Sequence, residues 1–453
     1  MIVSFSVSSF RSFGDEQTFS LVANDKLPHT HPGHLVPIPG SDEKVLRTSV
    51  LYGANGAGKS NLFKALRYLR EIAIRPPNSS TGTGRQAFRF SNTATEPSTL
   101  DLQFLHNGRL YRFGCKVDER HILEEWLVQV AGSAERILYE RVTDLNGDVT
   151  IEVTGLEQPS TKLNALATVG GPANQSFLAT IHANLKPADI GPELSGILDW
   201  FANKLILIGP DDVYGPMGKR FAEDNDLLDF AGDFLRSSST GVDHLQVVRN
   251  EVNPEALQGL FPDLHDLPKE TLEKGRPLRL DLGDGHELRK EGDRFYRTRI
   301  EAVHRQEEGQ LISLPLNEES DGTRRLLHLV PALHHLRSAS ATFFIDEIDR
   351  SLHPLLATRF LTSFLEAGAK GASQVIITTH ESSLLDQDLL RRDEVWFAEK
   401  NQQAMTQLYS LTDFPVRQDQ PLRKHYLQGR FGAVPFLGNV ERLFPEPEKD
   451  FVA

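Results

Sequence analysis

The segment GANGAGKS, residues 53–60, constrains the fold of this chain more than any other feature. It matches the pattern G-x-x-x-x-G-K-[S/T], with a hydrophobic strand predicted over residues 48–52 and an amphipathic helix predicted after it. Glycines at these positions let backbone N–H groups turn inward around phosphate oxygens, and the helix N-terminus adds a positive dipole. We therefore predict a phosphate-binding loop in an α/β protein, with Lys59 on the β- and γ-phosphates and the Ser60 hydroxyl on Mg²⁺.

Composition places the chain among globular proteins and limits its partners. It has 453 residues, of which 39% are hydrophobic and 25% charged, and a formal net charge of −13. This charge argues against a general nucleic-acid binder, although a local basic groove stays open. The single cysteine, Cys115, excludes an intrachain disulfide and a multi-cysteine metal site. No secretory signal pattern and no apolar run of about 18 residues is found, so we expect a cytoplasmic protein without a membrane partner.

A second acidic site follows an apolar strand predicted over residues 342–345. Asp346 and Glu347 end this strand. Beside a phosphate loop, Asp346 is expected to hold Mg²⁺ through water and Glu347 to polarise the attacking water. Lys59 and Asp346 lie 287 residues apart (346 − 59), and no N-K-x-D motif for guanine is present. The wide spacing differs from compact GTPases and ring ATPases and indicates a core divided by a large insertion.

The periodicity of the chain predicts four segments. Residues 1–154 hold the phosphate loop and an antiparallel sheet, with a hairpin turn at Asn107-Gly108. Residues 155–310 are a mixed, partly helical insertion with a hairpin turn at Asp284-Gly285, residues 311–400 alternate strands and helices, and residues 401–453 form a tail. The predicted fold class is α/β: a P-loop nucleotidase core with a mixed sheet, an antiparallel β-subdomain and an insertion.

Four ordered segments resemble the ABC-type ATPases of the SMC, RecF and OLD kind, which are AAA family members. GANGAGKSN carries the loop, ESDGT (319–323) stands where these proteins have a signature motif, FFIDEIDRSLHP (343–354) resembles their Walker B and D-loop, and QVIITTH ends in His380 at the switch-histidine position. FRSF (10–13) and YLQGRFGAVP (426–435) narrow the resemblance to stand-alone ATPase subunits of bacterial anti-phage systems of the PARIS and Rlo type.

The resemblance implies an ABC/SMC-head-like core and a composite site in which two protomers sandwich two ATP molecules. It implies that Glu347 and His380 act in catalysis, with His380 sensing the γ-phosphate, and that Ser60 and Asp346 hold Mg²⁺. Ser320 and Gly322 would contact the nucleotide of the partner, and Asp349 would couple the two sites. The remaining nucleotide-binding residues implied by the motif are Gly53, Asn55, Gly56, Ala57, Gly58, Lys59, Ser60 and Asn61. ESDGT lacks the second adjacent glycine of the transporter signature. No residue is assigned to a glutamine loop, although Gln86 and Gln103 both lie between the phosphate loop and the signature segment.

The expected function is therefore an ATP-hydrolysing sensor or scaffold that dimerises around ATP and regulates a separate effector, a nuclease or toxin, in anti-phage defence. OLD proteins carry a nuclease domain after the ATPase, whereas only about 50 residues follow Phe397 here. Two alternatives stay open: a RecF- or SMC-like repair ATPase that clamps DNA, and an ATP-binding scaffold with little turnover.

Three further features each allow two interpretations. The histidines His29, His31 and His34 fit a solvated loop better than a metal site. The pair Arg391-Arg392 favours a surface position over contact with a partner or nucleic acid. Residues 426–435 either pack on the core or dock an effector.

Overall fold

The computed structural model describes the chain in thirteen stretches. They are residues 1–27, 29–77, 82–90, 96–132, 134–156, 159–212, 217–253, 278–283, 286–291, 294–336, 340–367, 373–415 and 420–434.

A six-stranded sheet forms the centre of the molecule, in the order β11-β17-β18-β5-β19-β20. All neighbours pair in parallel except β19 with β20, which are antiparallel. The strands are β5 (Thr48–Tyr52), β11 (Leu205–Ile208), β17 (Thr342–Ile345), β18 (Gln374–Thr379), β19 (Val395–Lys400) and β20 (Thr406–Ser410). The central strands are continuous apolar runs because both faces of the sheet are buried.

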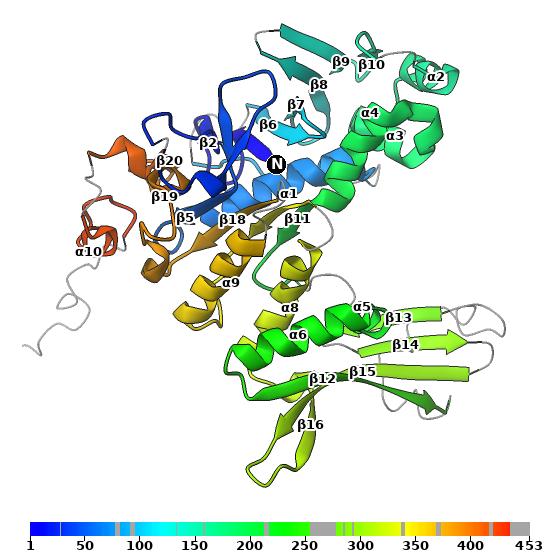
Figure 1. Cartoon of the computed structure of the whole chain (residues 1–453). Helices are drawn as coiled ribbons and strands as arrows, with labels where there is room; N and C mark the ends of the chain where they lie inside the picture. Colours follow the sequence, from blue (N-terminus) through cyan, green and yellow to red (C-terminus); the bar gives the residue numbers. More distant parts are fainter. Residues whose placement is uncertain are drawn as a thin grey trace, which may run out of the picture.

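Helices and a second sheet cover these two faces. On one face, α1 (Lys59–Ile74) lies between the central sheet and an antiparallel sheet, and all three share one core (Figure 1). On the other face, α8 (Asp321–His335) and α9 (Pro354–Ala367) pack in a second core. Alternate residues of each central strand therefore point to different cores, as Phe344 and Phe343 do.

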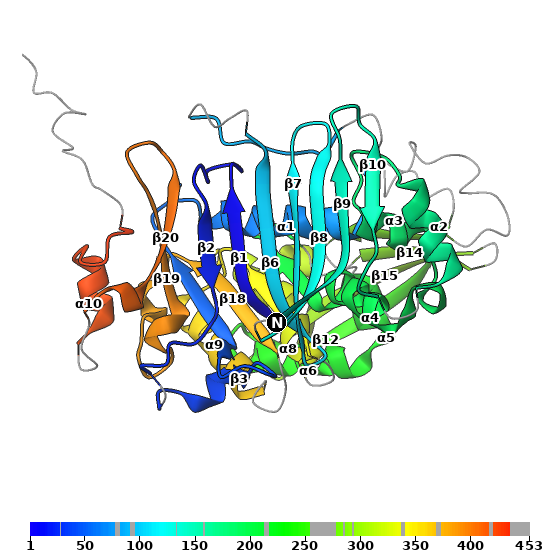
Figure 2. The same ribbon diagram turned by 90° about the horizontal axis from the view of Figure 1, so that it is seen from above.

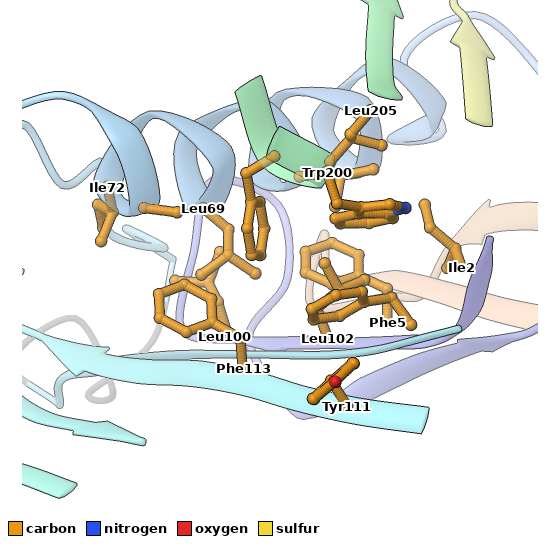
Figure 3. Close-up of a cluster of buried hydrophobic side chains, with 14 of the residues drawn as sticks. Ile2, Phe5, Leu69, Ile72, Leu100, Leu102, Tyr111, Phe113, Trp200 and Leu205 are labelled. Carbon is orange, nitrogen blue, oxygen red and sulfur yellow. The ribbon is translucent and has the colours of Figure 1, made fainter. Parts of the chain in front are cut away.

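The antiparallel sheet has seven strands in the order β10-β9-β8-β7-β6-β1-β2 (Figure 2). They are β1 (Ile2–Ser8), β2 (Gln17–Ser20), β6 (Ser98–His106), β7 (Arg109–Val117), β8 (Ile122–Ala131), β9 (Ala134–Thr143) and β10 (Val149–Glu152). The predicted hairpins are present, and Asn107 and Gly108 both have positive φ (49° and 72°), as their turn requires. Figure 3 shows Leu69 and Ile72 of α1 facing Leu100 and Phe113 of this sheet, with Trp200 beside them.

Residues 155–310 are distributed over both cores. The helices α2 (Thr161–Val169), α3 (Phe177–Asn184) and α4 (Pro187–Asp199) pack on the first core, and a π-helical turn (Trp200–Lys204) leads into β11 of the central sheet. Trp200 stacks on Phe104 of β6 at 4.2 Å between ring centroids, which fixes this part to the antiparallel sheet.

A smaller subdomain projects from the other face (Figure 1). It contains α5 (Met217–Glu223), α6 (Asn225–Ser237) and a sheet in the order β12-β15-β14-β13, with β16 paired to β15. The strands are β12 (Val242–Val252), β13 (Leu278–Gly283), β14 (His286–Glu291), β15 (Arg294–Arg305) and β16 (Leu311–Pro315). The predicted turn at 284–285 lies outside the described residues, and the strands on either side of it pair. The division of the chain at 154, 310 and 400 stays a prediction.

Two short elements complete the head. A hairpin of β3 (Leu35–Pro37) and β4 (Lys44–Leu46) lies in the histidine-containing loop, and α10 (Leu422–Leu427) lies near the C-terminus. Tyr426 of α10 and Phe431 stack on Phe397 in the second core, so the described part of 426–435 packs on the head. No helix in the described stretches is long and apolar enough to cross a membrane.

Candidate nucleotide site

The phosphate loop lies where the sequence predicts it, between the buried strand β5 and the first turn of α1. Gly56 and Gly58 have φ of 78° and 113°, a backbone region that residues with a Cβ rarely adopt. At Gly53, a Cβ would lie 2.5 Å from the Ala398 carbonyl oxygen of β19. The glycines therefore serve both the inward turn of the loop and its close packing on the sheet.

A cavity of about 590 Å³ opens above this loop. The central strands end here, and β5, β17 and β18 each deliver one segment to it. Its lining residues are Asn55, Gly56, Ala57, Gly58, Lys59, Ser60, Asn61, Glu347, Asp349, Arg350 and His380. Most of the predicted site residues, from three distant parts of the sequence, thus share one cavity.

Lys59 is buried at the base of this cavity. Its Nζ donates to the carbonyl oxygens of Gly53 (2.7 Å) and Ala54 (3.2 Å) and lies 3.3 Å from the His380 ring nitrogens. Burial lowers the pKa of Lys59 to about 8, although nearby carboxylates, chiefly Asp346, oppose part of that shift. Burial and the Lys59 ammonium lower the pKa of His380. The lysine is held by weak neutral acceptors that an anion could replace.

Asp346 is only 1% exposed and lies directly beneath the start of α1. The Ser60 hydroxyl is 3.3 Å from its Oδ1, to which Thr378 Oγ1 also donates at 2.5 Å. A hydroxyl and a carboxylate oxygen at this separation are hard oxygen ligands of the kind Mg²⁺ takes. The two residues predicted to hold the metal are therefore neighbours.

Glu347 has a strained backbone. Its φ is 50°, and its backbone N–H donates to Thr378 Oγ1 at 2.8 Å, so Thr378 fixes both acids of this turn. A non-glycine residue in this region costs about 1–3 kcal/mol and persists only where its surroundings hold it. With this backbone conformation the Glu347 side chain lines the cavity. Regular strand alternation would instead point it toward the face of the sheet that Phe343 and Ile345 share.

Asp349 connects the Walker B turn to the segment that carries His380. Its two oxygens accept hydrogen bonds from Thr379 Oγ1 (2.8 Å) and from the His380 backbone N–H (3.2 Å). Asp349 therefore joins the turn after β17 to the end of β18.

Ser320 and Gly322 do not line the cavity of their own chain. Ser320 is exposed and caps α8, accepting from the Thr323 backbone N–H at 3.1 Å. A Cβ at Gly322 would lie 2.9 Å from the Ser351 carbonyl oxygen, so α8 begins against the D-loop. This helix N-terminus therefore lies against the turn that holds Ser351, outside the lining of the cavity.

Sequence reasoning missed four residues at the site: Ser12 and Thr406 support the loop, Thr378 holds the Asp346-Glu347 turn, and Arg350 lines the cavity. Thr406, on β20, donates to the Ala57 carbonyl oxygen at 2.8 Å, and its hydroxyl is 2.7 Å from that of Ser12. Ser12 belongs to the FRSF segment, so a signal for it existed, whereas nothing local to Thr406 indicates this contact.

Two predictions concern residues outside the cavity. His34 was expected in a solvated loop, but its side chain is only 12% exposed and bonds the buried Glu394 at 2.9 Å. The surface position expected for Arg391 is wrong, because this residue is 1% exposed and pairs with Asp393 at 2.6 Å. Its guanidinium also donates to the Leu27 carbonyl oxygen, which ties the histidine loop to the segment just before β19.

A family model described as "AAA domain, putative AbiEii toxin, Type IV TA system" matches residues 49–386 and confirms the predicted AAA family. The search of curated sequences finds no match. Similar solved structures include an SMC head domain from Thermotoga maritima (14% identity, TM-score 0.37, 90% of this chain and 98% of that chain covered). A second is an SMC head bound to the C-winged helix domain of ScpA, with 13% identity and a TM-score of 0.41, covering 90% of this chain and 97% of that chain. A third, derived from Pyrococcus furiosus, has 10% identity and a TM-score of 0.36 and covers 90% of this chain and 96% of that chain. The P-loop fold is assigned from this chain's own strand order and loop.

Proposed function

Because the chain belongs to the AAA family that includes putative AbiEii-type toxins, we propose that it binds ATP with Mg²⁺ and hydrolyses it. One observation carries the proposal: the phosphate loop, the Asp346-Glu347 turn and His380 converge on a single cavity although they are far apart in the sequence. Phosphoryl transfer relies on positioning and electrostatic stabilisation, which this arrangement can supply.

Each group has a role consistent with its surroundings. The loop N–H groups and the α1 N-terminus bind the phosphates, and Lys59 exchanges the Gly53 and Ala54 carbonyls for phosphate oxygens. The anionic phosphates favour the charged form of Lys59, whose pKa of about 8 already keeps it mostly protonated at pH 7. Bound Mg²⁺ would neutralise developing phosphate charge, with Ser60 and Asp346 as its protein ligands.

The water that attacks the γ-phosphate is oriented by Glu347, the cavity carboxylate on the turn fixed by Thr378. His380 stands beside Lys59 and hydrogen-bonds the γ-phosphate in this proposal. Asp349 accepts a hydrogen bond from the His380 backbone N–H, so in this proposal it links the position of His380 to the position of the D-loop.

We further propose that ATP assembles a dimer. Ser320 and Gly322 stand at an exposed helix N-terminus beside the D-loop and outside their own cavity, which fits a contact with nucleotide bound by a second copy. In the cell, this dimer would be the sensor of an anti-phage system and control a separate nuclease or toxin in the cytoplasm. The toxin–antitoxin term in the family description and the resemblance of the motifs support this role.

The test compares matched variants of the full chain. Glu347→Gln should retain ATP binding and lose phosphate release by roughly 10²–10⁴-fold, the range for a general base. Glu366→Gln, on the exposed surface of α9, is its control. Lys59→Ala should lose ATP binding, whereas Lys64→Ala, on the exposed side of α1, should not. Wild-type phosphate release by Glu347→Gln would leave only an ATP-binding scaffold, and absence of ATP binding by the wild type would refute the proposal.

The composite site has its own test. Lys59→Ala and Ser320→Arg should each be inactive alone, and mixing them should restore part of the phosphate release, because one of the two sites in a mixed dimer is intact. No recovery on mixing, with light scattering showing monomers in ATP, would exclude the sandwich. ATP-stimulated, salt-dependent DNA binding would instead favour the DNA-clamping alternative.

A further inference from the structure

Arg350 is a cation at the rim of the nucleotide cavity for which neither the motif nor the family match gives a role. It directly follows Asp349 and lines the cavity together with Lys59 and His380. Its Nη2 lies 2.8 Å from Oδ1 of Asp211, and the two side chains are 46% and 80% exposed. The guanidinium therefore has a partner at the edge of the cavity while the cavity itself lies within its reach.

The position of Asp211 is fixed by the loop that follows β11. Asp212 accepts from the Gly209 backbone N–H at 2.7 Å and from the guanidinium of Arg67 on α1. The Gly209 carbonyl oxygen accepts from Arg325 of α8 at 3.1 Å. The backbone next to Asp211 is therefore tied to two helices, while its side chain is exposed to solvent and pairs with Arg350.

The backbone beneath Arg350 is equally well held. Its N–H donates to the Glu347 carbonyl oxygen at 3.1 Å, and the next residue, Ser351, has a φ of 62°. Two positive-φ residues, Glu347 and Ser351, thus bound a tight turn. Only the side chain of Arg350 needs to move for its guanidinium to leave Asp211.

Charge favours this movement when nucleotide binds. Besides Arg350, the cavity has one lysine, Lys59, against the carboxylates of Glu347 and Asp349, so the terminal phosphate of ATP meets few cations. Exposed ion pairs such as that between Arg350 and Asp211 are weak, whereas arginine bonds phosphate through charge-assisted, often bidentate hydrogen bonds. The phosphate is therefore the stronger partner.

We propose that Arg350 binds the terminal phosphate of ATP held by its own chain, and that Asp211 retains the guanidinium at the rim when no nucleotide is present. This inference rests on the proposed ATP binding and adds a second phosphate cation to it. Asp211 lowers the affinity for ATP, because its ion pair with Arg350 must break on binding.

Titration calorimetry with Mg-ATP and Mg-ADP on the full chain tests the pair, in the Glu347→Gln background so that ATP persists. We expect Arg350→Gln to weaken ATP binding about tenfold, as for one lost hydrogen bond to a charged group, and to change ADP binding less than twofold. Asp211→Asn should tighten ATP binding about threefold, as for one exposed ion pair. The double variant should match Arg350→Gln alone.

The matched control is Asp233→Asn, since Asp233 is 73% exposed and pairs with Arg236 at 3.4 Å away from the cavity. It should bind ATP as the parent does. Unchanged ATP affinity in Arg350→Gln, equal losses for ATP and ADP, or an Asp211→Asn effect that persists without Arg350 would each overturn the inference. If the parent binds ATP and Lys59→Ala does not, these outcomes leave the proposed function intact; a parent that binds no ATP refutes that function first.

Discussion

Replacing Thr406 by valine should loosen the phosphate loop without touching the cavity. Thr406 is 1% exposed at the start of β20, and its hydroxyl donates to the Ala57 carbonyl oxygen at 2.8 Å. It also lies 2.7 Å from the Ser12 hydroxyl, which accepts from Asn61 Nδ2 at 2.8 Å. One hydroxyl thus joins the loop, the N-terminal segment and the last strand of the sheet.

The expected magnitude follows from what valine keeps and removes. It keeps the branched shape that fills the space above Gly58, so no cavity forms. It removes the hydroxyl that links Ala57 to Ser12 and leaves a buried carbonyl without that donor, which costs about 1–3 kcal/mol of unfolding free energy. Thr406→Ser is the matched control, because it retains the hydroxyl and loses one methyl group, worth about 0.8 kcal/mol.

Urea denaturation without nucleotide and calorimetry with Mg-ATP separate the two effects. Thr406→Val should bind ATP several-fold more weakly than Thr406→Ser, since the Ala57 peptide is part of the loop that holds the phosphates. If the valine variant binds ATP as tightly as the serine variant and is no less stable, the hydroxyl does not position the loop and this reasoning is refuted.

Three other perturbations follow from the same structure. The pKa of Lys59 is about 8 in the folded protein against an ordinary 10.5, so between these pH values the unfolded chain binds more protons than the folded one. The unfolding free energy of the wild type, minus that of Lys59→Met, should therefore rise with pH across this window by up to about 1.4 kcal/mol per pH unit. If urea denaturation gives a difference that does not change with pH, the lowered pKa is contradicted. Glu125→Ala should lower the unfolding free energy by about 3–5 kcal/mol and Glu125→Gln by less, because both remove the charge opposite the buried Arg141 but glutamine keeps an oxygen that can accept from the Tyr139 hydroxyl or the Phe177 N–H; equal losses by thermal denaturation would mean that only the charge matters. Gly58→Ala should abolish ATP binding, since the added Cβ would lie 2.0 Å from Thr406 Oγ1 at a φ of 113°; binding at wild-type affinity would mean that the loop tolerates the shift.

The loop itself could be predicted from sequence because its determinants are local. Eight consecutive residues, a strand before them and a helix after them specify the phosphate-binding backbone. Asp346 and Glu347 could be predicted for a similar reason, since an apolar strand that ends in two acids places them at one sheet edge.

The contacts that support the loop could not be predicted, because they join residues far apart in the chain. Thr406 and Ser12 are 394 residues apart, and although Ser12 lies in the FRSF segment, nothing near Thr406 in the sequence indicates that the two meet. Arg391 was expected at the surface as part of the charge pair Arg391-Arg392, but Asp393 and backbone carbonyls satisfy its donors in the interior. Burial of a charge depends on partners that only the folded chain brings together.

Strand order, rather than chain spacing, is what assembles the site. The loop, Asp346 and His380 follow β5, β17 and β18, and these strands are consecutive and parallel in the order β17-β18-β5. Parallel neighbours about 4.8 Å apart place all three carboxyl ends within about 10 Å at one edge. The separation of 287 positions between Lys59 and Asp346 (346 − 59) adds little to the entropy of closure, which grows only with the logarithm of loop length. Another parallel strand, β11, pairs with β17, and the loop after it carries Asp211 to the side of the cavity where Arg350 lies. Insertions between these strands can therefore vary widely without disturbing the site, whereas a change in strand order would destroy it.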